Sequence, residues 1–199
     1  MKTGKYLMTV AAIMLLSITR LSAQDKNSDF TPHHYFEVGA EYAFCLSNDW
    51  DGKVGGYFIY GKQRTTKYSQ GFGIGLEYYR NKSNDFVVGI GDGNGNVNNK
   101  TFKDYRYNVP VFADFRFNLS QSKEPFYVNV RAGATFGFSD GDLEDGGLLF
   151  SAGLGKSFNA GSVSISPYVR ADFATLIAGA AGSAAWVEPL IALGVNLRF

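Results

Sequence analysis

Apolar residues recur at every second position through most of this chain, and this spacing constrains the fold more than any other feature. The clearest case is the end of the chain, where small or polar residues alternate with Ile191, Leu193, Val195, Leu197 and Phe199. Successive side chains of an extended strand point to opposite faces, so a period of two gives one apolar face and one polar face. No convincing helical period follows the first 24 residues. The sequence therefore predicts an all-β protein.

The same alternation marks eight expected strands, each about as long as the ~9–11 residues of a tilted membrane-spanning strand. They lie near 36–44, 53–61, 72–79, 107–117, 126–138, 147–157, 163–173 and 189–199. The connections alternate in length: modest ones at 62–70, 120–125 and 158–161, and longer polar ones at 81–104 and 139–146. Short turns at one end and long loops at the other are typical of outer-membrane barrels. We therefore predict an eight-stranded antiparallel up-and-down transmembrane β-barrel over residues 35–199.

Residues 1–24 are predicted to be a signal peptide that is removed on export. Lys2 and Lys5 give it a positive start, and small residues precede a cleavage site near Ala23. Its apolar stretch, Leu7 to Ile18, is shorter than the ~20 residues of a spanning helix, which disfavours the alternative of an N-terminal membrane anchor. Residues 25–34 are expected to form a short linker.

Alternation alone does not decide which face of a barrel is inside, because a soluble ligand-binding barrel alternates equally well. A water-exposed face is usually rich in Lys and Glu. Here the polar face carries mainly Gly, Ser, Asn, Tyr, Glu and Arg, and the best-defined strands place no Lys on it. The apolar face carries large rings near the strand ends, as an aromatic girdle requires. We predict that the apolar face contacts lipid, with a soluble, secreted ligand-binding barrel as an alternative.

The signal peptide, the eight alternating segments and the ending Gly194–Phe199 resemble small outer-membrane β-barrel proteins of Gram-negative bacteria. The stretch Tyr107–Phe117 is similar to the porin-family barrel domain common in Bacteroidetes. This resemblance covers the whole chain after the signal peptide. It implies a place in the bacterial outer membrane, contact with its lipid and lipopolysaccharide, and insertion by the barrel-assembly machinery. It also implies that Phe199 is the assembly signal read by that machinery, a role compatible with a girdle position.

Several charged residues fall on the inward face and are predicted to form a lumen charge network. An isolated charge in a narrow, low-dielectric interior is costly, and the planar guanidinium of Arg pairs well with carboxylates. Side chains fill the interior of an eight-stranded barrel, so we expect ion pairs and no open aqueous channel. The predicted members are Glu37, Glu41, Glu77, Asp114, Arg116, Arg131, Arg170, Asp172, Glu188 and Arg198. Hydration at the rims of the barrel is the alternative for Glu37 and Glu188.

Composition disfavours several other classes of function. The 19 Lys and Arg against 18 Asp and Glu give no electrostatic signature of nucleic-acid binding. His33 and His34 are the only histidines, and they precede the first strand on the expected periplasmic side. We predict no catalytic residue, metal site or cofactor, and hence no enzyme. The sequence predicts a monomeric barrel with a plugged lumen and a structural, adhesive or surface-interaction role. A narrow channel for small or hydrophobic solutes is the alternative.

Overall fold

The computed structural model describes residues 30–46, 50–81, 86–91, 97–102, 105–139, 142–178 and 184–199. The predicted signal peptide and residues 25–29 of the expected linker lie outside these ranges. Among the described residues, no helix has the length and apolarity needed to cross a membrane. The strands are β1 (His33–Cys45), β2 (Trp50–Gln63), β3 (Tyr68–Asn81), β4 (Phe86–Gly91), β5 (Val97–Phe102), β6 (Tyr105–Asn118), β7 (Phe126–Ser139), β8 (Asp142–Lys156), β9 (Phe158–Ala160), β10 (Val163–Ala178) and β11 (Ala184–Arg198).

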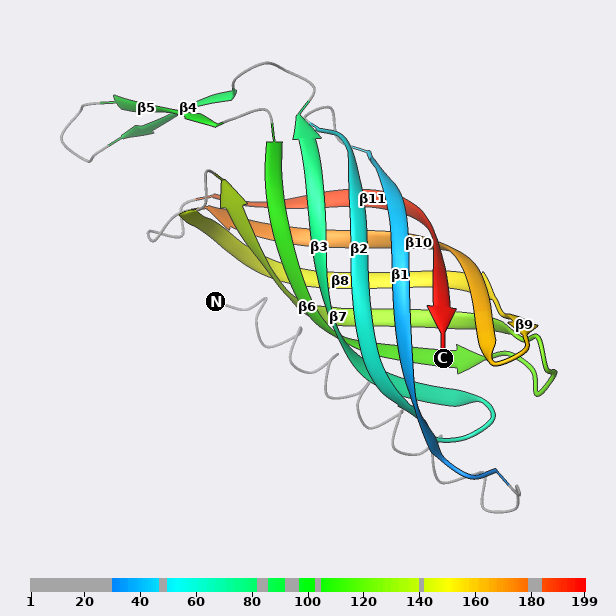
Figure 1. Ribbon diagram of the computed structural model, residues 1–199. Coiled ribbons are helices and arrows are strands. Elements are labelled where there is room, and N and C mark those ends of the chain that lie inside the picture. The colour runs from blue at the N-terminus through cyan, green and yellow to red at the C-terminus, as the bar shows by residue number, and fades with distance from the viewer. Residues whose placement is uncertain are drawn as a thin grey trace.

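Eight long strands form a closed antiparallel barrel (Figure 1). Their hydrogen-bonded order is β1-β2-β3-β6-β7-β8-β10-β11, and β11 pairs back onto β1. Two backbone hydrogen bonds between Phe36 and Phe199, of 2.8 and 3.1 Å, extend this closing seam. The short β9 follows β8 after an interruption at Ser157 and pairs with the start of β10. The predicted fold class, an eight-stranded up-and-down barrel, is confirmed.

The connection expected at 139–146 is wrong in its length. Ser139 pairs directly with Asp142, and residues 142–146 belong to β8. This segment continues as a strand because β8 is also hydrogen-bonded to β10, where Gly146 pairs with Ile177. Backbone ladders of this kind do not depend on apolar side chains, so a polar sequence extends the β7–β8 hairpin beyond its predicted end.

The long connection at 81–104 contains a second, separate sheet. Strands β4 and β5 pair in antiparallel register from Phe86 opposite Phe102 to Gly91 opposite Val97. This hairpin lies at the end of the barrel opposite to β9 and the C-terminal residue (Figure 1). We call its end of the barrel the hairpin end and the other the short-turn end, since the latter carries the turns at 64–67 and 161–162.

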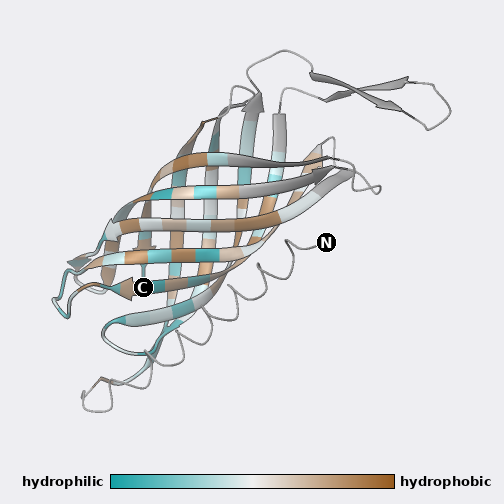
Figure 2. Cartoon of the chain, turned by 180° about the vertical axis from the view of Figure 1, so that it is seen from behind, coloured by the Kyte–Doolittle hydropathy of each residue, from teal (hydrophilic) through white to brown (hydrophobic). Residues whose placement is uncertain are grey.

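Side chains alternate between the exterior and the interior along the barrel strands, and Figure 2 shows the matching alternation of hydropathy. In β1, Glu37 is fully buried whereas the neighbouring Phe36 is 50% exposed. Large apolar side chains are exposed around the outer surface, and most buried side chains are polar or charged. This distribution is the inverse of that in a water-soluble protein.

Five inward-facing rings each lie directly opposite a glycine of the adjacent strand. The pairs are Tyr35–Gly61, Tyr57–Gly39, Phe112–Gly73, Tyr127–Gly155 and Tyr168–Gly194. A Cβ atom at any of these glycines would overlap the opposite ring. Because glycine has no side chain, each ring can lie across the neighbouring strand and occupy the lumen.

Candidate functional site

The interior carries two clusters of paired charges, and the first lies toward the short-turn end. Arg116 Nη2 on β6 donates to both carboxylate oxygens of Glu37 on β1, at 2.9 and 3.1 Å. Arg198 Nε on β11 donates to Oε2 of the same carboxylate at 2.9 Å. Glu37 thus holds two guanidinium groups that come from strands on either side of β1 in the barrel order.

Asp114 is the second acid of this cluster. Its Oδ1 accepts hydrogen bonds from Arg131 Nε at 2.9 Å and from Asn129 Nδ2 at 2.8 Å, both on β7. The guanidinium carbon of Arg131 lies 4.0 Å from the ring centroid of Tyr57 and 4.8 Å from that of Phe112. An arginine above aromatic faces gains a cation–π interaction in addition to its ion pair.

The second cluster lies toward the hairpin end and contains Glu41, Lys53, Glu77, Arg170 and Asp172. Arg170 pairs with Asp172 in a fork, through Nε at 2.5 Å and Nη2 at 3.1 Å, and Nη2 also donates to Glu41 at 2.6 and 2.8 Å. Lys53 Nζ lies 2.7 Å from Glu77, 3.1 Å from Asp172 and 3.3 Å from Glu41. One buried ammonium group therefore faces three carboxylates, two of which also bind Arg170.

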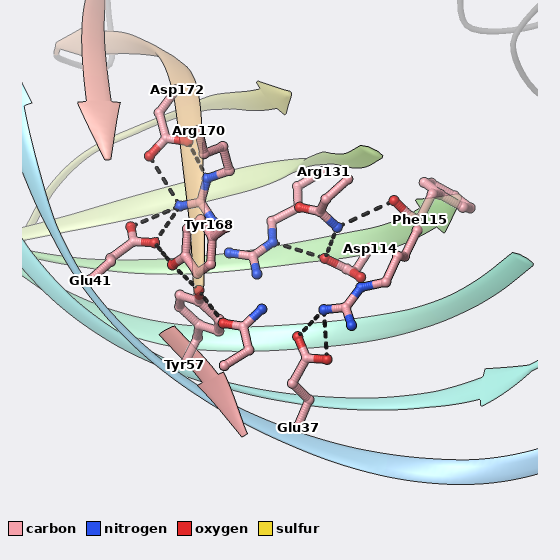
Figure 3. Close-up of polar contacts among 12 residues, drawn as sticks. Glu37, Glu41, Tyr57, Asp114, Phe115, Arg131, Tyr168, Arg170 and Asp172 are labelled. Atoms are coloured by element: carbon pink, nitrogen blue, oxygen red, sulfur yellow. Dashed lines mark hydrogen bonds and ion pairs between the residues drawn. The ribbon is translucent and has the colours of Figure 1, made fainter. Parts of the chain in front are cut away.

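Two tyrosines from the strands that flank the closing seam lie between the clusters (Figure 3). The hydroxyl groups of Tyr57 on β2 and Tyr168 on β10 are in contact. Tyr168 donates to Glu41 Oε2 at 2.6 Å, and Tyr57 donates to Asn196 Oδ1 at 2.9 Å. Since Arg131 covers the Tyr57 ring, polar contacts continue from the first cluster to the second.

Nine of the predicted network residues are brought into these two clusters: Glu37, Glu41, Glu77, Asp114, Arg116, Arg131, Arg170, Asp172 and Arg198. The side chain of Glu188 lies outside the described residues. Rim hydration, the alternative for Glu37, does not hold because this side chain is fully buried. Each of the nine contacts at least one group of opposite charge, which offsets the cost of burying it.

Lys53 is the member that the sequence interpretation missed. Its expected strand, 53–61, is one of two with a weaker alternation, the other being 147–157, because Gly52, Gly55 and Gly56 interrupt the apolar pattern. The signal was nevertheless present: Lys53 is in phase with Tyr57, which lies four residues further along the same strand and points into the barrel. A lysine in phase with a buried face requires carboxylate partners, and the inward Glu residues supply them.

The remaining predicted residues lie away from the lumen network. His33 Nδ1 lies 3.3 Å from the Thr31 carbonyl oxygen, and His34 Nδ1 lies 2.9 Å from the Tyr60 hydroxyl. Both histidines form the first two residues of β1, where a linker was expected. Within the described residues, no three His, Cys, Asp or Glu side chains are arranged to hold a metal ion. Phe199 is exposed on the outer surface beside the seam.

No protein-family model and no curated protein matches this sequence. Among solved structures, the crystal structure of Neisserial surface protein A (NspA) matches with a TM-score of 0.55 and 12% identity, over 85% of this chain and 98% of that chain. The two share a fold. A major outer membrane protein from Thermus thermophilus also matches, with a TM-score of 0.43 and 14% identity over 83% of this chain and 99% of that chain.

Ail from Yersinia pestis, solved in a phospholipid bilayer nanodisc, matches with a TM-score of 0.43 and 14% identity, over 84% of this chain and 100% of that chain. Of these three structures, NspA has the highest TM-score, and the comparison of folds rests on it. It agrees with the predicted likeness to small outer-membrane barrels at the level of the fold. The narrower likeness to the Bacteroidetes porin family stays a prediction.

Proposed function

We propose that this protein is an integral, monomeric barrel of the bacterial outer membrane, closed to solutes by its own side chains, whose hairpin end interacts with partners at the cell surface. The observation that carries this proposal is the inverted distribution of polarity. Charged side chains such as Asp114 and Asp172 are fully buried, whereas Phe72 on the outside is 76% exposed. Such a surface suits hydrocarbon, and a closed barrel satisfies the backbone hydrogen bonds that lipid cannot. A soluble ligand-binding barrel would show the opposite arrangement.

The closed lumen is supported by contacts that cross the interior between strands that are not neighbours. Arg116 on β6 binds Glu37 on β1, and Lys53 on β2 binds Asp172 on β10. Eight strands enclose a lumen just wide enough for side chains to fill. Ion pairs and rings at two levels of the barrel therefore favour a plug over a pore.

The orientation follows from the connections. Bacterial outer-membrane barrels have short periplasmic turns and longer extracellular loops, so the short-turn end faces the periplasm and the β4–β5 hairpin faces outward. NspA, which shares the fold, carries the description of a surface protein. In this proposal residues 1–24 direct export, the barrel-assembly machinery reads Phe199, and lipid and lipopolysaccharide surround the barrel. The role at the surface is structural or adhesive and requires no catalytic residue.

Two adjacent residues of β11 give a matched test of the proposed membrane orientation. Val195 faces outward and Asn196 faces the lumen, with exposed fractions of 39% and 3%. Nitroxide labels are attached at single cysteines at these positions, in a variant lacking Cys45, and the refolded barrel is placed in lipid vesicles. We expect the label at 195 to be relaxed strongly by oxygen dissolved in lipid and weakly by a water-soluble nickel chelate. Strong relaxation of that label by the chelate would contradict the proposal.

A narrow water-filled path is the second candidate, and one observation favours it. Several buried polar atoms of the described residues make no hydrogen bond, among them Asp114 Oδ2, Arg116 Nε and the Tyr35 hydroxyl oxygen. Buried groups of this kind commonly bind ordered water. Planar-bilayer recordings separate the two candidates: a steady conductance of the wild-type barrel, even a small one, supports the path, and its absence supports the plug.

A further inference from the structure

Basic side chains gather at the short-turn end without matching acids. The described residues at this end include Lys62, Arg64, Lys67, Lys123 and Lys156, and no ion pair joins any of these five to a described carboxylate. Glu124 is the one acidic side chain in the described turns that carry these residues. The lumen charges are paired, whereas these five basic side chains and Glu124 together leave the described part of the short-turn rim with a net positive charge.

One of these lysines lies beside exposed rings, and the turn that carries a second lysine is held next to it. Lys156 Nζ is 4.8 Å from the ring centroid of Phe158 and 5.1 Å from that of Phe126. These rings are 40% and 59% exposed on the outer surface. Asn159 Nδ2 donates to the Lys123 carbonyl oxygen at 2.7 Å, which holds the β6–β7 turn against β9. We call Lys123, Phe126, Lys156 and Phe158 the Lys156 site.

We infer that the Lys156 site binds an anionic phospholipid of the membrane leaflet at the short-turn end. This inference rests on the proposed function, because it requires this end to lie at a membrane surface. Rings at the end of a membrane strand lie at the depth of the lipid headgroups. A lysine at that depth keeps its stem on apolar surface and its ammonium group among the headgroups. The phosphodiester then lies between Lys123 and Lys156, with acyl chains against Phe126 and Phe158.

The charge of the site favours an anionic lipid over a zwitterionic one. Each basic residue near an anionic surface strengthens binding about fivefold, and two lysines together by about 25-fold. Glu124 lies on the same turn and opposes this attraction, but the site keeps a net positive charge. A zwitterionic headgroup adds a cation that the two lysines repel, so phosphatidylcholine gains little from them.

Native mass spectrometry of the refolded, detergent-solubilised barrel tests the inference. The probes are dioleoylphosphatidylglycerol and dioleoylphosphatidylcholine, titrated separately. We expect the wild type to retain phosphatidylglycerol preferentially, and the Lys123→Gln/Lys156→Gln variant to bind it at least fivefold more weakly. Lys62→Gln/Lys67→Gln is the matched control: it also removes two charges from the same end of the barrel, at positions that are not part of the site. This control should bind as the wild type does.

Equal retention of the two lipids by the wild type would overturn the inference. Equal weakening by Lys62→Gln/Lys67→Gln would also overturn it, since that result indicates only a diffuse charge effect. Binding of the wild type to purified peptidoglycan, lost in the double variant without any lipid preference, would also overturn it. Heat-modifiable mobility of each variant verifies that it is folded. Flotation with vesicles of phosphatidylcholine alone tests membrane insertion separately, so a failure of the proposed function is distinguishable from a failure of this site.

Discussion

Arg116 and Glu37 are joined across the barrel interior by two hydrogen bonds of 2.9 and 3.1 Å, although they are 79 positions apart in the sequence. Their strands, β6 and β1, are separated in the barrel order by β2 and β3. The contact therefore links parts of the wall that share no backbone hydrogen bonds. Because β1 also forms the closing seam with β11, this ion pair ties the seam to the middle of the sheet.

Removing the Glu37 charge should destabilise the barrel strongly. Glu37→Gln leaves Arg116 and Arg198 without their carboxylate partner, and breaking a buried ion pair typically costs about 3–5 kcal/mol. The measurement is the urea concentration at which the folded, fast-migrating form in vesicles is half lost. Glu124→Gln, which removes an exposed carboxylate, is the matched control and should shift the stability by less than about 0.5 kcal/mol. Equal midpoints for the wild type and Glu37→Gln would contradict the assigned role.

Lys53 should be energetically coupled to the carboxylates that it contacts. Lys53→Met removes the ion-pair partner of Glu77 and leaves Glu41 and Asp172 to share Arg170, so it should destabilise the barrel by about 3 kcal/mol or more. Glu77→Gln removes the carboxylate that lies closest to the ammonium group. The double variant should therefore lose less than the sum of the single variants, with a coupling energy of about 1–3 kcal/mol in a double-mutant cycle. Simple additivity would show that the contact contributes nothing.

Valine substitutions at two glycines of neighbouring strands distinguish the effect of interior packing from the effect of strand propensity. Gly39 faces the lumen under the Tyr57 ring, whereas Gly56 faces outward and a Cβ there would find only the Gly39 carbonyl oxygen, at 3.6 Å. Gly39→Val should destabilise the barrel by about 1–3 kcal/mol through overpacking. Gly56→Val should be neutral or stabilising, since valine favours strands. Urea midpoints of both variants test this, and equal effects would argue against a filled lumen.

Truncating the two central rings should open the lumen if side chains block it. The wild type is expected to show no steady conductance in planar bilayers. Tyr57→Ala/Tyr168→Ala removes both rings from between the charge clusters and should give rise to discrete conductance steps. Heat-modifiable mobility must first show that this variant is folded. A folded double variant that conducts no better than the wild type would indicate that the charge clusters alone close the barrel.

Phe199 and Phe36 provide a test of the assembly signal. They are paired by backbone hydrogen bonds and are similarly exposed, at 57% and 50%. Loss of a girdle ring should affect both positions equally, whereas loss of a terminal signal should affect only Phe199. We expect Phe199→Ala to lower the amount of folded barrel in outer-membrane fractions several-fold, with Phe36→Ala near the wild-type level. Similar amounts of folded barrel for both variants would indicate that Phe199 acts only as a girdle residue.

Alternation predicted the barrel because lipid and lumen impose opposite polarities on adjacent residues, as Val195 and Asn196 illustrate. It could not place the end of the β7–β8 hairpin, since Asp142 and Asp145 suit both a loop and a strand that continues past the apolar region. Alternation also could not predict which of the inward charged residues pair with each other. Which arginine meets Glu37 depends on the stagger of strands far apart in sequence, and alternation carries no information on stagger.

The opposition of rings and glycines also restricts how the strands can align while the barrel forms. If β2 slid along β1 by two residues, Tyr57 would move from Gly39 to a position opposite Glu37 or Glu41, and Tyr35 would leave Gly61. Both rings would then meet bulky neighbours in place of bare backbone. Misaligned closure is therefore sterically penalised at several places around the circumference. The side chains themselves thus disfavour an incorrect strand register.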